Sequence, residues 1–253
     1  MSGTEDNTPD DTVPRFLDAG EAALVVEFGS DVDPGISARV LALDAALSDR
    51  APDGIRELVP TYRSLMIHYD PLRLSRDALA GQVMECLAAP AAKAASPAHW
   101  TVPCCYDPPC GEDAKEIASL LGIAADSLVE RHAAATYRAY MYGFAPGYTY
   151  LGGLPPEIAV PRRPSPRGSH APGAVLIGGG LCSISTFAMP TGWYVIGRTP
   201  ERLYAPEREK PFLLEPGDTI TFEPVDAAAF EALSRRAASG EVVARGPARC
   251  RPA

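Results

Sequence analysis

Residues 137–200 read YRAYMYGFAPGYTYLGGLPPEIAVPRRPSPRGSHAPGAVLIGGGLCSISTFAMPTGWYVIGRTP, and this stretch decides the architecture of the chain. Glycine supplies backbone angles that other residues resist, and proline fixes φ and removes a hydrogen-bond donor. A folded segment rich in both is typically a set of tight turns that join short strands. The apolar pieces YRAYMYGF, AVLIGGG and WYVIGRT are short and aromatic or β-branched, so they predict strands.

Aromatic rings and cations recur among these turns. The groups suited to a small polar ligand are Tyr142, Tyr148, Arg162, Arg167 and Arg198. Arginine presents a planar fork of donors that matches carboxylates and phosphates, and it can stabilise an oxyanion. Taken alone, each arginine is better explained by a surface ion pair, and each tyrosine by packing. The recurrence of rings and cations in segments with turn chemistry nevertheless favours a binding site.

Composition and charge limit the partners of the chain. The 253 residues are enough for two domains, and 46% of them are hydrophobic and 22% charged, which is ordinary for a globular protein. The formal net charge of -9 argues against nucleic acid as a partner. No apolar run approaches the ~20 residues that cross a bilayer, so we expect no membrane segment. The acidic start, MSGTEDNTPDDTVPR, predicts a disordered leader and no secretory signal, hence a cytoplasmic protein.

Cysteine spacing argues against a metal or redox site. The six cysteines stand at positions 86, 104, 105, 110, 182 and 250. No pair has CxxC spacing, and no histidine lies at ligand spacing from the group at 104–110. We therefore expect reduced thiols and no metal.

The first part of the chain alternates strand and helix patterns. Asp33-Pro34-Gly35 opens one helical stripe, and Ser75 caps a second. Strands are predicted at 23–29, 55–60, 64–71 and 99–107. The order β-α-β-β-α followed by another strand is close to a split βαβ unit, which predicts a ferredoxin-like domain.

The later part of the chain predicts a helical connector and then a β-rich domain. Asp126 or Ser127 is expected to cap the second connector helix, and His132 near its end fits a packed or capping histidine. A hairpin is predicted around the turn at 216–218, and one late helix at 226–241. The predicted segments are a leader at 1–15, a ferredoxin-like domain at 16–98, a strand with a helical connector at 99–136, a β-rich domain at 137–245 and a tail at 246–253.

Motifs of several common enzymes are absent. The sequence has no GxxxxGK[ST] phosphate loop, no HExxH zinc motif and no GxSxG nucleophile elbow. The glycine run at 178–180 lacks GxGxxG spacing and a following helix, so it is a weak phosphate-binding signal. A Ser169–His170 dyad is disfavoured because neighbours on an extended segment point to opposite faces. What remains is half of a site, which a second protein would complete.

The order of the motifs resembles one known family. YGFAPGYTYLGG, Pro161-Arg162, Pro166-Arg167, PGAVLIGGG and PTGWYVIGRTP stand as in allophanate hydrolase subunit 1. The same family contains the B subunit of 5-oxoprolinase and the Kip-type inhibitor of a sporulation histidine kinase, and it resembles the first half of the carboxyltransferase domain of urea carboxylase. Upstream, RSLMIHYDP, VPCCYD, GEDAKEIASLLGI and SLVERHAAATYRAYMYGF fit its earlier blocks, so the resemblance covers about residues 16–225.

This resemblance implies an α+β fold, with a ferredoxin-like N-terminal domain followed by a cyclophilin-like β-barrel. It implies a heteromer with subunit 2 of the same system. The two subunits together would act as a hydrolase or carboxyltransferase on a small ureido, amide or lactam substrate. In 5-oxoprolinase a third subunit takes part and ATP is consumed, so the resemblance implies nucleotide binding. Urea carboxylase relatives imply biotin carried on another chain, and no covalently bound cofactor is expected here.

Site roles carry over by position. As catalytic residues, Arg162, Arg167 and Arg198 would hold the substrate or its oxyanion. The substrate-binding residues carried over would be Gly143, Phe144, Pro146, Gly147, Gly192, Trp193 and Gly197. Tyr142 and Tyr148, selected above from the residues themselves, would line the same pocket and complete the predicted substrate-binding set.

Two features depart from the oxoprolinase-type pattern. Residues 181–193 end in MPTGW where those members read close to QTGIYPxxxPGGW, and this segment is more similar to the urea carboxylase half. That similarity makes a biotin-dependent carboxyltransferase one alternative. His170 stands where valine is common, and we expect it to be exposed. An inhibitor of a histidine kinase is the alternative of another class, since it needs no catalytic groups.

Overall fold

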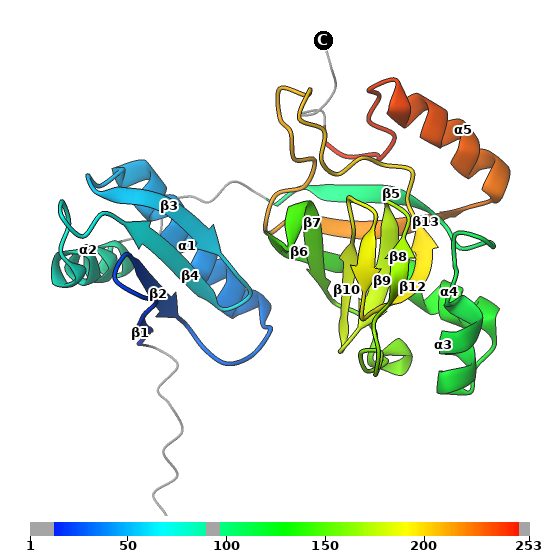
Figure 1. Ribbon diagram of the computed structural model, residues 1–253, viewed down its shortest axis with the longest axis horizontal. Coiled ribbons are helices and arrows are strands. Elements are labelled where there is room, and N and C mark those ends of the chain that lie inside the picture. Colours follow the sequence, from blue (N-terminus) through cyan, green and yellow to red (C-terminus); the bar gives the residue numbers. More distant parts are fainter. Residues whose placement is uncertain (1–12, 90–96, 248–253) are drawn as a thin grey trace, which may run out of the picture. The chain divides into compact units, whose positions relative to one another are not determined.

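The computed structural model describes residues 13–89 and 97–247 (Figure 1). The chain divides into two compact units between Ala95 and Ser96. Among the described residues, the first unit is an open sheet with helices and the second contains a closed barrel. Most of the predicted leader lies outside the described residues, but Arg15 already opens a strand, so the prediction of a leader through residue 15 was too long.

The N-terminal unit is built from elements whose ends the sequence marks. They are β1 (Arg15–Asp18), β2 (Ala23–Glu27), α1 (Pro34–Arg50), β3 (Ile55–Pro60), β4 (Ser64–Tyr69) and α2 (Arg76–Ala88). Oδ1 of Asp33 accepts hydrogen bonds from the backbone N–H groups of Gly35 and Ile36, at 2.7 and 2.9 Å, which begins α1. Oγ of Ser75 accepts one from Ala78 at 3.2 Å and begins α2. The predicted helix start at Asp33 and the predicted cap at Ser75 are confirmed.

The sheet of this unit has the strand order β1-β2-β4-β3, with antiparallel neighbours throughout. β2, α1 and β3, with β4 between the two strands, form the predicted split βαβ arrangement (Figure 1). The remaining edge strand differs from the prediction. β1 precedes this arrangement in the chain and pairs with β2, whereas a ferredoxin-like order needs a strand after α2. The unit therefore departs from the predicted order at one edge.

The helices of this unit bury one apolar stripe each. α1 buries Val40, Leu43 and Leu47, and α2 buries Leu79 and Val83. These side chains share one core with the inward residues of β2 and β4. Each fully buried aliphatic side chain stabilises the fold by about 1.5–3 kcal/mol relative to exposure, before conformational entropy is counted.

The C-terminal unit is built around the barrel. Its elements are β5 (His99–Cys105), α3 (Ala114–Leu121), α4 (Ala125–Ala134), β6 (Tyr137–Gly143), β7 (Ala145–Gly152), η1 (Pro156–Ile158), β8 (Arg167–His170), β9 (Ala174–Gly178), β10 (Leu181–Ile184), β11 (Met189–Thr191), β12 (Tyr194–Arg198), β13 (Thr219–Val225) and α5 (Ala227–Ala238). The barrel order is β10-β7-β6-β13-β5-β12-β9, while β8 and β11 form a separate two-stranded sheet. This confirms the barrel predicted for the second half of the chain.

Barrel closure joins segments that are far apart in the sequence. β5 pairs in parallel with β13, from His99 opposite Thr219 to Cys105 opposite Val225. β12 also passes close to β5, because a Cβ atom at Gly197 would lie 2.8 Å from Sγ of Cys104. Gly197, predicted as a substrate-binding residue, therefore allows two strands to approach.

Three local predictions for this unit need correction. The strand predicted at 99–107 is present as β5, but it belongs to the barrel and not to a ferredoxin-like sheet. The turn at 216–218 leads into β13, and the described residues just before it are not in a strand, so no hairpin forms. α4 begins after Ala124 without a side-chain cap, because Asp126 and Ser127 lie inside the helix.

Two negative findings apply to residues 13–89 and 97–247. No helix there is long and apolar enough to cross a membrane. No cluster of three or more His, Cys, Asp or Glu side chains there is placed to hold a metal ion. The described cysteines, Cys86, Cys104, Cys105, Cys110 and Cys182, are free thiols, and Cys250 lies outside the described residues.

Candidate functional site

β8 and β11 contribute to a small cavity in the C-terminal unit. Its volume is about 190 Å³. The predicted site residues that meet here are Phe144, Tyr148, Arg162, Gly192 and Trp193. The structure adds Tyr150, His170, Met189, Pro190 and Thr191. We call this set the ring-lined cavity.

Aromatic side chains form much of the wall. Tyr148 and Trp193 are buried, whereas Phe144 is 77% exposed at the rim. The Tyr150 ring centroid lies 5.0 Å from that of Tyr148 and 6.2 Å from that of Trp193. Phe144 has a φ of 69°, a left-handed backbone that a bulky residue rarely adopts. Strain of this kind concentrates at functional sites.

His170 is only 2% exposed, which corrects the expectation of an exposed histidine. Its burial follows from pairing with Met189 across β8 and β11. Nδ1 lies 3.0 Å from the carbonyl oxygen of Ala171 and 3.4 Å from Oγ of Ser185. Because a carbonyl only accepts, Nδ1 carries the proton in that bond, and in the neutral ring Nε2 is an acceptor. Nε2 is buried and has no hydrogen-bonding partner among the described residues.

Arg162 and Thr191 supply donors to the same cavity. The guanidinium carbon of Arg162 lies 5.6 Å from the ring centroid of Trp193, in a cation–π contact. Within residues 13–89 and 97–247, Arg162 makes no hydrogen bond or ion pair. Oγ1 of Thr191 accepts the N–H of Trp193 at 3.0 Å, so its own O–H can donate elsewhere.

The tyrosines of the wall stay protonated near neutral pH. The hydroxyl of Tyr148 lies 2.9 Å from Oγ of Ser183. Burial raises the pKa of Tyr148 to about 12, although the hydrogen bond with Ser183 lowers it. Burial also raises the pKa of Tyr150, against the lowering effect of Arg162. These rings therefore act as neutral walls and not as phenolate bases.

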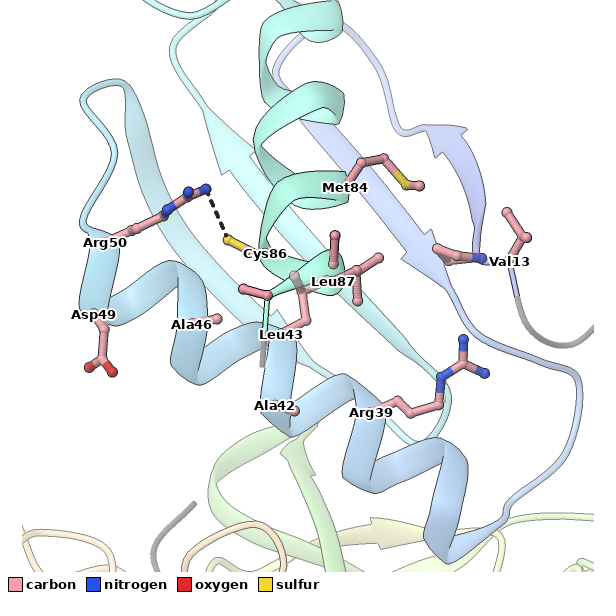
Figure 2. Close-up of a pocket in the computed structure, with 13 residues that line it drawn as sticks. Val13, Arg39, Ala42, Leu43, Ala46, Asp49, Arg50, Met84, Cys86 and Leu87 are labelled. Atoms are coloured by element: carbon pink, nitrogen blue, oxygen red, sulfur yellow. Dashed lines mark hydrogen bonds between the residues drawn. The ribbon is translucent and has the colours of Figure 1, made fainter. Parts of the chain in front are cut away.

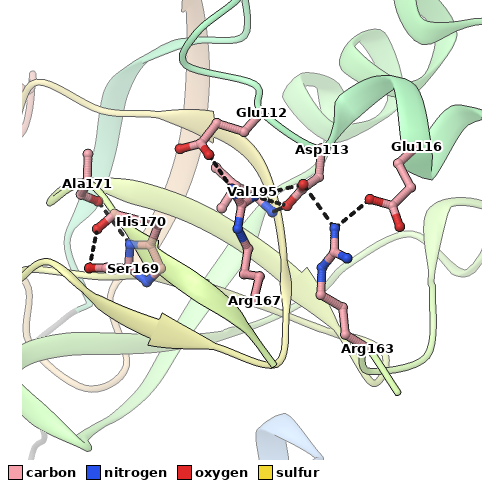
Figure 3. Close-up of polar contacts among 9 residues, drawn as sticks. All are labelled: Glu112, Asp113, Glu116, Arg163, Arg167, Ser169, His170, Ala171 and Val195. Atoms are coloured by element: carbon pink, nitrogen blue, oxygen red, sulfur yellow. Dashed lines mark hydrogen bonds and ion pairs between the residues drawn. The ribbon is translucent and has the colours of Figure 1, made fainter. Parts of the chain in front are cut away.

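Arg167 belongs to an ion-pair cluster centred on Asp113, outside the ring-lined cavity (Figure 3). Nη1 of Arg167 lies 2.7 Å from each carboxylate oxygen of Asp113, and Nη2 pairs with Glu112. Oδ2 of Asp113 also accepts the backbone N–H of Val195 at 2.7 Å. Arg167 and His170 are the first and last residues of β8. The cluster therefore fixes the strand that carries His170.

Arg163, which the sequence reasoning did not select, is the second cation of this cluster (Figure 3). Its Nη2 lies 2.9 Å from Oδ1 of Asp113 and 2.5 Å from a carboxylate oxygen of Glu116. Its guanidinium carbon lies 4.2 Å from the ring centroid of Tyr194. Its backbone N–H donates to the carbonyl of Gly192 at 2.8 Å, next to the cavity wall.

Arg198 lies in a second cavity of about 440 Å³. Its Nε donates to the carbonyl oxygen of Pro172 at 2.9 Å, and its guanidinium carbon lies 5.3 Å from the Phe230 ring centroid. Ser185 lines this second cavity and also contacts Nδ1 of His170. The three predicted arginines therefore have three different surroundings and do not converge on one point.

The remaining predicted residues do not line the ring-lined cavity. They are Tyr142, Gly143, Pro146, Gly147 and Gly197. The Tyr142 ring lies 5.0 Å from that of Phe212, its buried hydroxyl has no partner among the described residues, and burial raises its pKa. Gly147 has a φ of +71°, and a Cβ atom there would lie 2.6 Å from Cβ of Tyr204. Only glycine adopts this positive φ and leaves room for Tyr204 without strain.

The N-terminal unit has a pocket of about 610 Å³ against α1 and α2 (Figure 2). Its lining is mainly apolar and includes Met84. Arg39 lies 4.9 Å over the Phe28 ring, and Nη1 of Arg50 lies 3.5 Å from Sγ of Cys86. No predicted site residue lies here, and both arginines have partners. We therefore place the candidate site in the C-terminal unit.

A second fully buried histidine, His132, lies in the core of the C-terminal unit. Its Nδ1 lies 2.8 Å from the hydroxyl of Tyr106, and its Nε2 lies 3.7 Å from Sγ of Cys182. Burial lowers the pKa of His132 to about 3 and raises the pKa of the Cys182 thiol. Both ring nitrogens have partners, which confirms the prediction of a packed histidine.

The family model described as carboxyltransferase domain, subdomain C and D, matches residues 14–214. The chain belongs to this carboxyltransferase family. The B subunit of 5-oxoprolinase from Bacillus subtilis (strain 168) is 30% identical over 214 residues, which cover 80% of this chain and 89% of the relative. The resemblance deduced from the motifs is thereby confirmed at the level of the family.

Two solved structures are similar in fold to this chain. The crystal structure of TTHA0988 aligns at 35% identity with a TM-score of 0.73, covering 80% of this chain and 40% of that one. The Kluyveromyces lactis urea carboxylase aligns at 19% identity with a TM-score of 0.76, covering 92% of this chain and 24% of that one. This chain thus spans about two fifths of the first protein and about a quarter of the second. At 19% identity the second likeness concerns the fold alone.

Proposed function

We propose that this carboxyltransferase-family chain is one subunit of an enzyme that acts on a small lactam, amide or ureido compound, with 5-oxoproline as the favoured substrate. The observation that carries this function is the ring-lined cavity, where the unpartnered Nε2 of His170 and the donors of Arg162 and Thr191 meet aromatic walls. The name of the Bacillus relative, aligned over 89% of its length, supports the choice of 5-oxoproline.

The size and chemistry of the cavity suit a small polar molecule. Its volume of about 190 Å³ is below the ~300–1,000 Å³ typical of pockets for drug-sized ligands. Arg162 offers donors to a carboxylate or a developing oxyanion, and one preorganised donor of this kind contributes about 10²–10³ in rate. Aromatic walls keep water away, which strengthens these interactions. Arg167, held by Asp113, would position β8 without touching the substrate.

A second protein would complete the site. Among the described residues, the lining of the cavity contains no carboxylate, thiol or lysine to attack the substrate or to activate water. The exposed Phe144 ring at the rim offers an apolar contact where the partner closes over the cavity. We therefore propose a heteromer with subunit 2 of the same system, which supplies the missing catalytic group.

A nucleotide does not fit the ring-lined cavity. The space is about 190 Å³, and within the described part of the chain Arg162 is the one arginine or lysine that lines it. The glycine run after β9 leads into β10 and not into a helix N-terminus that would bind phosphate. ATP consumed by the assembled enzyme would therefore bind outside this cavity, and biotin, in the carboxylase alternative, would arrive on another chain.

Co-expression with a homologue of subunit 2 tests this function. We expect a stable complex that opens 5-oxoproline in the presence of ATP, and a loss of about 10²–10³ in rate with Arg162→Ala. Turnover of urea with bicarbonate and a biotinyl carrier, and none of 5-oxoproline, would instead establish the carboxylase alternative. Failure to form any complex, combined with binding to a histidine kinase, would establish the inhibitor alternative and contradict the proposal.

A further inference from the structure

We propose that His170 selects the substrate by its N–H group. Nε2 accepts the hydrogen bond that a lactam or amide N–H donates, while Arg162 and Thr191 hold a carboxylate and the carbonyl oxygen. This assignment rests on the proposed function, because it concerns the same cavity. The hydrogen bond to Nε2 would distinguish a substrate with an N–H group from ketones, esters and N-substituted lactams of the same shape.

The ring of His170 is held in one orientation. Nδ1 contacts the carbonyl oxygen of Ala171 at 3.0 Å and Oγ of Ser185 at 3.4 Å, and Ser185 is itself buried. Turning the ring over would place a carbon atom against that carbonyl and lose the bond. The opposite nitrogen, Nε2, is therefore held as an acceptor without a partner among the described residues, in a ring that lines the cavity.

The other polar groups of the wall supply mainly donors. Arg162 has only N–H groups. Oγ1 of Thr191 already accepts from Trp193, and its O–H is a donor that it can offer to a ligand. The Tyr148 hydroxyl is engaged with Ser183. A ligand that satisfies this wall must offer one donor to Nε2 and acceptors to the other two groups.

A five-membered lactam with a carboxylate has that pattern. Its carboxylate accepts from a guanidinium, its carbonyl accepts from a hydroxyl, and its amide N–H is a donor. The aromatic side chains contact one another, with ring centroids 5.0–6.2 Å apart, so they form a continuous wall against which the lactam ring can pack. A ligand of the same shape with CH₂ in place of N–H would leave Nε2 buried and unpaired. Such a loss lowers affinity by about tenfold to a hundredfold.

Calorimetric binding to the full chain, alone and in complex with subunit 2 without ATP, tests this selection. The ligands are 5-oxoproline, its CH₂ isostere 3-oxocyclopentane-1-carboxylate, N-methyl-5-oxoproline, and pyrrolidin-2-one, which lacks the carboxylate. We expect 5-oxoproline to bind about tenfold to a hundredfold more tightly than the isostere and the N-methyl compound. Pyrrolidin-2-one should bind weakly. It should still bind more tightly than cyclopentanone, which has CH₂ in place of its N–H group.

Variants assign the preference to one residue. His170→Leu should abolish it, His170→Gln, which retains an acceptor, should restore part of it, and His68→Leu in the N-terminal unit should leave it unchanged. Equal affinity of the wild-type protein for 5-oxoproline and its isostere would overturn the proposal, as would an undiminished preference in a folded His170→Leu protein. If His170→Leu does not fold, the wild-type ligand series and His170→Gln still decide.

The outcome separates this inference from the proposed function. A complex that turns over 5-oxoproline but shows no preference for the N–H compound overturns the role of His170 alone. A chain that discriminates by N–H but forms no complex that turns over 5-oxoproline keeps the role of His170 and overturns the proposed activity.

Discussion

His132 and His170 are both almost completely buried in the same unit, yet their surroundings differ in kind. His132 has a partner at each ring nitrogen, a hydroxyl at 2.8 Å and a thiol at 3.7 Å, among the side chains of the main core. His170 has its contacts at Nδ1, whereas Nε2 has no partner among the described residues, and the residue lines a cavity. Burial alone therefore does not distinguish a packed histidine from a functional one, and the unsatisfied atom does.

The arginines repeat this difference. Arg167 gives its donors to Asp113 and Glu112, whereas Arg162 stacks on Trp193 and makes no hydrogen bond within the described ranges. A satisfied guanidinium holds elements together, and an unsatisfied one is available to a ligand. The sequence PRRPSPR alone does not show which of its arginines is paired and which is available to a ligand.

The largest expected effect comes from releasing the strand that carries His170. Asp113→Ala removes a carboxylate that is only 6% exposed and leaves Arg163, Arg167 and the N–H of Val195 without their shared acceptor. Breaking a buried pair in this way costs about 3–5 kcal/mol of unfolding free energy. Chemical denaturation measures it.

The matched control is Glu223→Ala, which breaks the exposed pair with Arg245. That change should cost less than about 1 kcal/mol. Equal losses for the two variants would mean that the Asp113 cluster does not hold β8.

A smaller effect is expected from pH, and it concerns His132. Burial holds its folded-state pKa at about 3, below the ordinary value of 6.5, so the native state resists protonation. As pH falls below about 6.5 the unfolded chain binds the proton first, and stability is lost progressively down to the folded pKa. Between pH 7 and pH 5 this group should remove about 2 kcal/mol. Unfolding curves of wild type and His132→Gln at both pH values measure it, and identical pH dependence in the two proteins would contradict the assignment.

The smallest expected effect separates the two arginines. Arg162→Ala should change the unfolding free energy by less than about 0.5 kcal/mol, because the side chain is exposed and makes no ion pair within the described residues. It should weaken binding of carboxylate-bearing ligands by about tenfold, which is about 1.4 kcal/mol. Arg167→Ala should do the reverse, with a clear loss of stability. Calorimetric titration measures the binding and thermal unfolding measures the stability of both variants. A stability loss with Arg162→Ala and a binding loss with Arg167→Ala would show that the two roles are misassigned.

Much of the fold could be predicted because its signals are local. The caps at Asp33 and Ser75 and the helix at 227–238 follow from short-range side-chain chemistry. β1 was missed because RFLD is a four-residue edge strand without a clear alternation. The sheet to which β5 belongs could not be predicted, since its partner β13 lies about 120 residues further along the chain.

The site was predicted only in part, for the same reason. The motifs identified Phe144, Tyr148, Arg162 and Trp193 as a group, and the structure places them on one cavity. They also included Arg167, whose availability depends on Asp113, 54 positions away. The burial of His170 depends on its pairing with β11, so no local signal could reveal it.

The most direct test compares the two histidines in one sample. In ¹⁵N-histidine-labelled protein, the ring nitrogen resonances of the four histidines are followed by NMR during titration with 5-oxoproline, with assignments from single His→Gln variants. We predict that the Nε2 signal of His170 moves as it accepts a hydrogen bond, while both His132 signals stay in place. Movement of neither histidine, or of His132 instead, would contradict the conclusion that the ring-lined cavity around His170 is the substrate site.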